Sequence, residues 1–75
     1  MNDPVEARLS AAQREYDEVE EVLLRRLPEF RLYLALLDPD ARARCKQILS
    51  ADPEFQRWCA LAAEITRLYR ATDRA

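Results

Sequence analysis

The clearest hydrophobic pattern covers residues 4–26, where apolar side chains recur at alternating intervals of four and three residues. This spacing places them on one stripe of an α-helix, about 80° wide, with polar residues around the rest of the circumference. A stripe this narrow suits packing against one other long helix. Its members are Val5, Leu9, Ala12, Tyr16, Val19 and Leu23.

Residues 53–72 carry a wider apolar stripe that covers roughly half of the helix circumference. At about 1.5 Å per residue, this helix and the first would be roughly 30 and 35 Å long, so we expect them to lie alongside each other. The stripe consists of Phe55, Trp58, Leu61, Ala62, Ile65, Leu68 and Tyr69.

Two shorter segments lie between the long ones. Residues 39–51 have one ordinary apolar face, formed by Ala41, Cys45, Ile48 and Leu49. Residues 28–37 are apolar over roughly 200° of the wheel, more than a chain this small readily covers. Either this segment is the central core helix, or part of it faces a partner or a second copy. For that interface we select Leu32, Tyr33, Leu36 and, from the last helix, Trp58, because Tyr and Trp are common interface anchors.

Prolines mark where the helices begin. Three Asp-Pro pairs, at positions 3–4, 38–39 and 52–53, fit an N-capping aspartate followed by proline in the first helical turn. Pro28 marks a fourth start, and the residue before each proline is disfavoured in a helix. The sequence therefore predicts a single all-α domain over residues 1–75. Its helices span 4–26, 28–37, 39–51 and 53–72, with the two short ones turning the chain at one end of a bundle.

The composition argues against catalysis. The chain has no glycine, which the backbone of a phosphate-binding loop requires. It also has no histidine, which is the usual general base and the commonest metal ligand. Cys45 and Cys59 do not form a CxxC pair, and we expect both to be small buried hydrophobes. We therefore expect no enzyme activity, no metal site and no cofactor.

Charge divides the chain into an acidic and a basic part. Residues 1–40 hold ten acids and five bases, whereas residues 41–75 hold four acids and seven bases. A dense acidic run in the first helix is either a solubilising face or a surface for a basic protein. It consists of Glu15, Asp17, Glu18, Glu20 and Glu21.

The basic part suggests a second class of function. Two short helices in succession outline a helix-turn-helix, whose 39–51 helix would present basic and amide side chains to nucleic acid. These are Arg42, Arg44, Lys46 and Gln47. Against it, the turn lacks glycine and the net charge is −2, so we do not expect nucleic acid as the main partner.

The sequence contains no apolar run long enough to cross a bilayer, and its first residues are acidic, so we expect a cytoplasmic protein that does not bind membranes. Its strong preference for arginine over lysine is typical of a GC-rich bacterial or phage genome. The sequence as a whole predicts a non-catalytic protein-interaction module that self-associates, such as an adaptor, a small chaperone-like binder, an inhibitor or an assembly subunit. The alternative is a small nucleic-acid-binding regulator.

Overall fold

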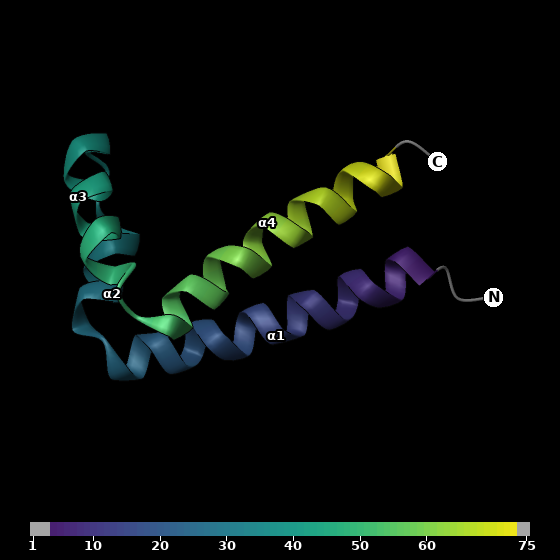
Figure 1. Ribbon diagram of the computed structural model, residues 1–75, viewed down its shortest axis with the longest axis horizontal. Helices are drawn as coiled ribbons and strands as arrows, with labels where there is room; N and C mark the ends of the chain where they lie inside the picture. Colours follow the sequence, from purple (N-terminus) through teal and green to yellow (C-terminus); the bar gives the residue numbers. More distant parts are fainter. Residues whose placement is uncertain (1–3, 74–75) are drawn as a thin grey trace.

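A computed structural model describes residues 4–73, and about 90% of these residues are helical, with no strand among them. The two long helices run antiparallel as a hairpin, and the two short ones join them at the end farthest from both termini (Figure 1). This confirms the predicted all-α class and the predicted position of the short helices. The elements are α1 (Pro4–Arg26), α2 (Pro28–Ala35), α3 (Pro39–Leu49) and α4 (Pro53–Asp73).

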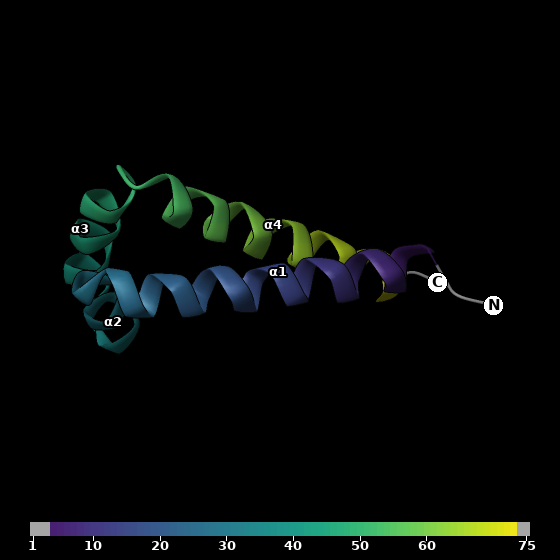
Figure 2. The ribbon, with the colours of Figure 1, turned by 90° about the horizontal axis from the view of Figure 1, so that it is seen from below.

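The molecule is elongated. Helices α1 and α4 cross at an angle, because they diverge towards the free ends in Figure 1 and towards the α2–α3 end in Figure 2. The overall extents are 43 × 24 × 19 Å. The radius of gyration is 14.3 Å, against about 11 Å for a compact domain of this length. Much of each long helix is therefore covered by its neighbour on one side only.

The prolines set the helix starts as predicted. Leu27, which precedes Pro28, is extended with φ −119° and ψ 104°, and so separates α1 from α2. The two short helices end two residues earlier than predicted, at Ala35 and Leu49. Leu36 is extended, with φ −71° and ψ 128°, whereas Ser50 and Ala51 form a turn, so both helices end three residues before the next capping aspartate.

The aspartate caps form as expected where the structure describes them. Asp38 accepts a hydrogen bond from the backbone N–H of Ala41 at 3.1 Å. Asp52 accepts two, from Glu54 at 2.9 Å and Phe55 at 3.3 Å. Each aspartate thus satisfies amides of the first turn that have no partner within the helix. The cap predicted at Asp3 lies outside the described residues.

Aromatic rings from three helices form the centre of the core. Phe30 of α2 lies edge-on to Trp58 of α4, with ring centroids 5.0 Å apart and an interplanar angle of 89°. Tyr33 lies edge-on to Phe55, with ring centroids 5.7 Å apart. Tyr16 of α1 stacks on Trp58, with ring centroids 5.2 Å apart. Edge-to-face and offset pairs of this kind are favourable beyond the area they bury. We call these five residues the aromatic cluster.

The remaining core residues continue the predicted stripes away from the aromatic cluster. In α1, Val19 and Leu23 are buried, whereas Leu9, nearer the N-terminus, is only half-buried. Tyr69, which the stripe of α4 placed in the core, has 54% of its surface exposed. Ala12 and Leu68 are nevertheless buried, with 6% and 8% of their surfaces exposed, so α1 and α4 also cover each other beyond the end that α2 and α3 close.

Ion pairs connect α1 to α4 along the hairpin. Arg26 pairs with Asp52 at 2.8 Å and with Glu54 at 3.3 Å, where the two helices meet at the closed end. Further along, Glu15 pairs with Arg57, and the Arg8 guanidinium lies 3.8 Å from the Glu64 carboxylate. From the closed end outwards, the paired residues move back along α1 and forward along α4, as antiparallel helices require. Exposed pairs stabilise a fold only slightly, but their order favours this register of the two helices.

Asp52 combines capping with an ion pair. The pKa of its carboxyl is lowered from the usual value, chiefly because the Arg26 guanidinium donates a hydrogen bond to the carboxylate. The amides of Phe55 and Glu54 also lower this pKa, and desolvation opposes them. The carboxylate is therefore held in its charged form at the junction of α1 and α4.

The first prediction compares the two caps. Asp38→Ala removes one capping hydrogen bond and should lower the free energy of unfolding by about 1 kcal/mol. Asp52→Ala removes two capping hydrogen bonds and the Arg26 pair, so it should destabilise the protein more than Asp38→Ala does. Urea unfolding followed by circular dichroism measures both values. Equal losses would show that the Arg26–Asp52 contact adds nothing.

The second prediction concerns pH. Because the folded-state pKa of Asp52 lies below the unfolded value of about 3.8, its carboxylate stabilises the fold above that pH. This contribution is lost as pH falls through the folded-state pKa. Asp52→Asn keeps a capping oxygen but loses the charge. Its Tm should lie below that of the wild type at pH 7, and the difference should shrink towards zero in acid. A difference that stays constant with pH would contradict this explanation.

Candidate protein-interaction surfaces

The four predicted interface residues differ in how far the structure exposes them. Tyr33 and Trp58 belong to the aromatic cluster, with only 6% and 7% of their surfaces exposed, so they offer little area to a partner. Leu36 is half-buried at the end of α2. Leu32 has 56% of its surface exposed and remains available for a contact. Helix α2 is thus a core helix on one side and an uncovered apolar surface on the other.

Other apolar side chains at the same end of the molecule are exposed. Leu37, in the connection between α2 and α3, is 94% exposed, and Leu34 is 39% exposed. Ile48 of α3, expected on the buried face of its helix, is 71% exposed. Helix α3 packs through Leu49 and Cys45, and nothing in the described chain covers its Ile48 side. We call the four exposed residues Leu32, Leu34, Leu37 and Ile48 the apolar end surface.

Two hollows accompany the apolar end surface. One, of about 320 Å³, lies where α3 returns towards α4 and includes Ile48 with Leu27 and Leu49. The carboxylates of Glu29 and Asp52 also line it.

The second hollow is cationic. It measures about 290 Å³ and is lined by Tyr33, Pro39, Arg42, Ala43 and Lys46. The guanidinium carbon of Arg42 lies 4.7 Å from the centroid of the Tyr33 ring, a cation–π contact. Arg42 therefore lies against the ring of Tyr33 although its own side chain is exposed. We call this feature the cationic hollow.

The acidic run of α1 does not form one uniform face. Asp17, Glu18 and Glu21 are exposed, on the side of α1 opposite its buried stripe. Glu15 and Glu20 are half-buried at the edges of that stripe, and Glu15 is engaged by Arg57. Glu21 pairs within its own helix with Arg25, and Asp17 accepts a hydrogen bond from Gln13 at 3.2 Å.

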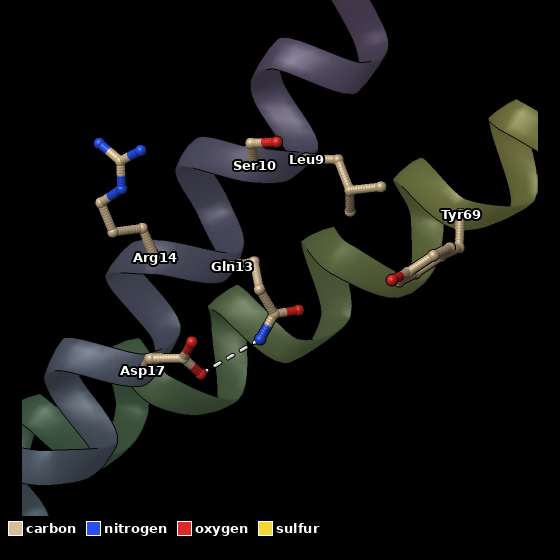
Figure 3. A pocket seen from close by; sticks show the side chains of 6 residues that line it. All are labelled: Leu9, Ser10, Gln13, Arg14, Asp17 and Tyr69. Atoms are coloured by element: carbon tan, nitrogen blue, oxygen red, sulfur yellow. Dashed lines mark hydrogen bonds between the residues drawn. The ribbon is translucent and has the colours of Figure 1, made fainter.

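A groove of about 450 Å³ separates α1 from α4 near the free ends of the hairpin (Figure 3). Leu9 and Tyr69 reach into it from opposite helices, whereas Arg14 projects away from α4. Gln13 and Asp17, joined by their hydrogen bond, and Ser10 complete the α1 side.

The cysteines and the acidic side chains are the candidate groups for thiol chemistry and metal binding. Among residues 4–73, no three Cys, Asp or Glu side chains gather closely enough to hold a metal ion. Burial raises the pKa of the Cys59 thiol, which lowers the fraction of reactive thiolate. The Cys45 thiol lies 3.6 Å from the carbonyl oxygen of Glu29, and both cysteines are free and half-buried. None of the helices in the described part combines the length and apolarity needed to span a membrane.

Comparison with known proteins adds no further constraint: no family model, no curated protein and no solved structure matches this chain. The candidate site must therefore be judged on geometry. By that measure the α2–α3 end is the strongest candidate, because it gathers exposed apolar side chains next to a cationic hollow. Three of its exposed apolar residues, Leu34, Leu37 and Ile48, were not among the predicted interface residues, because helical periodicity placed them with buried neighbours.

The third prediction separates the two sides of α2. Tyr33→Ala should lower the free energy of unfolding by about 3 kcal/mol, because it leaves a cavity in the aromatic cluster. Leu32→Ala should change the stability of the isolated chain by less than about 0.5 kcal/mol, because its side chain is exposed. Denaturant unfolding at low protein concentration, where association is minimal, measures both. A large loss for Leu32→Ala would place Leu32 in the core.

Proposed function

We propose that this chain is a non-catalytic protein-interaction module that associates with a second copy of itself through the α2–α3 end. The observation that carries the proposal is the apolar end surface. Its residues Leu32, Leu37 and Ile48 are each more than half exposed, although they belong to the part of the chain that also holds the best-packed core. Large apolar side chains grouped in this way are typical of interaction sites.

The surface area of the chain supports a second copy as the occupant. The accessible surface is 5732 Å², against roughly 4800 Å² for a compact monomer of 8.8 kDa. The excess, about 900 Å², is close to the area that each partner contributes to a standard-size protein interface. A chain this short also has little core of its own, and association is a common means of stabilising such domains.

The fourth prediction tests self-association. Leu32→Glu should convert the wild-type oligomer to a monomer and leave the helix content unchanged, because the charge replaces an exposed apolar side chain rather than a core one. Tyr69→Glu is the matched control, since Tyr69 is exposed to almost the same extent in the last turns of α4, at the opposite end of the hairpin. Analytical ultracentrifugation at micromolar concentration measures the mass of each protein.

A wild-type protein that sediments as a monomer at these concentrations would overturn the proposal. Dissociation by Tyr69→Glu but not by Leu32→Glu would move the interface to the open end of the hairpin. A salt-dependent shift of duplex DNA by the wild type at physiological ionic strength would favour the nucleic-acid alternative instead.

A further inference from the structure

The cationic hollow lies on the most basic helix of the molecule. Helix α3 holds three basic residues, Arg42, Arg44 and Lys46, and one acid, Asp40. All three bases are exposed, and Arg42 and Lys46 line the hollow beside the ring of Tyr33. Two cations beside an aromatic ring suit a carboxylate ligand, because the ring packs against its aliphatic stem and the cations bind its oxygens.

The acidic segment of α1, residues 15–21, has the complementary charge. It holds five acids and no base. Among them Glu18 and Glu21 point outward from the hairpin, and the neighbouring Val22 is 41% exposed. The pair that Glu21 makes with Arg25 is exposed, so a second cation can compete for the same carboxylate at small cost.

The two features belong to neighbouring parts of the chain. Glu21 and Glu18 lie five and eight residues before the end of α1 at Arg26, about 8 and 12 Å along the helix axis. The α2–α3 end, with the cationic hollow, begins directly after that point. A two-fold dimer that sets α3 of each copy against α1 of the other would form the contact between hollow and acidic segment twice.

We propose that, in the self-association described above, the cationic hollow of each copy binds the acidic segment of α1 of the other copy. The apolar end surface supplies buried area, and the opposite charges select the orientation of the two chains. This inference rests on the proposed self-association and adds the residues on both sides of the contact. It also implies that association weakens as salt concentration rises.

The fifth prediction is a charge-swap experiment. One variant reverses the hollow, Arg42→Glu with Lys46→Glu, and the other reverses the acidic segment, Glu18→Lys with Glu21→Lys. Each alone should raise the dissociation constant by about tenfold or more, because like charges then face each other twice in the dimer. Mixed in equal amounts, the two should form a heterodimer as stable as the wild-type dimer, because both contacts again join opposite charges.

A matched control carries the same change in net charge elsewhere. Arg67→Glu with Arg70→Glu reverses two exposed cations of α4, away from the hollow, and should leave the dissociation constant unchanged. Circular dichroism checks that each variant is folded. Because Arg42 lies over Tyr33, Lys46→Glu paired with Glu18→Lys provides a second swap that leaves this contact intact.

The outcomes separate this inference from the proposed function. If the reversed variants associate like the wild type while Leu32→Glu dissociates, the chain self-associates but the hollow does not bind the acidic segment. If both reversals weaken association and their mixture does not restore it, the two surfaces do not contact each other. If the wild type itself is monomeric, both proposals fail together.

Discussion

Five aromatic rings from three helices meet where the hairpin closes, and the position of every other element follows from that contact. Phe30 and Tyr33 hold α2 against Phe55 and Trp58 of α4, and Tyr16 brings α1 onto the same cluster. Trp58 is buried there although, within residues 4–73, its Nε1–H has no hydrogen-bond acceptor, a cost of about 1–3 kcal/mol. The ring contacts and buried area therefore outweigh a polar penalty at the centre of the fold.

The same contact explains why the rest of the molecule is open. Helices α2 and α3 are used to close one end of the hairpin, so nothing in the described chain lies over the sides of α1 and α4 nearer their free ends. Helix α3 reaches the core only through its Leu49 and Cys45 side, which leaves Ile48 exposed. A chain of this length can build one well-packed core but cannot also cover the outer surface of that core.

The charged residues divide into those that join the two long helices and those that face outward. The ion pairs between α1 and α4 lie along the flanks of the hairpin and use Arg26, Glu15 and Arg8 from α1. The outward acids of α1 and the bases of α3 are not part of this set. Charges outside this set, acidic on α1 and basic on α3, are the ones on which the proposed contact between two copies rests.

The sequence alone determined the helices and their order. Proline and aspartate act locally: Asp38 caps the amide of Ala41, and Leu27 is extended because Pro28 follows it, whatever the rest of the chain does. Helical periodicity also identified most of the core, including Val19, Leu23 and Phe55, because a continuous stripe requires a neighbour somewhere along it.

Only the tertiary structure decided which apolar residues of the 28–37 segment are buried. Tyr33 and Leu32 are adjacent and both apolar, yet one lies in the aromatic cluster and the other faces outward. The difference depends on the angle at which α2 meets α1 and α4, which no local pattern contains. The same holds for Ile48, and for Glu15, whose pairing with Arg57 depends on the register of two helices about forty residues apart in the sequence. Periodicity gives a residue's position on its own helix, whereas exposure depends on the surfaces that neighbouring helices leave uncovered.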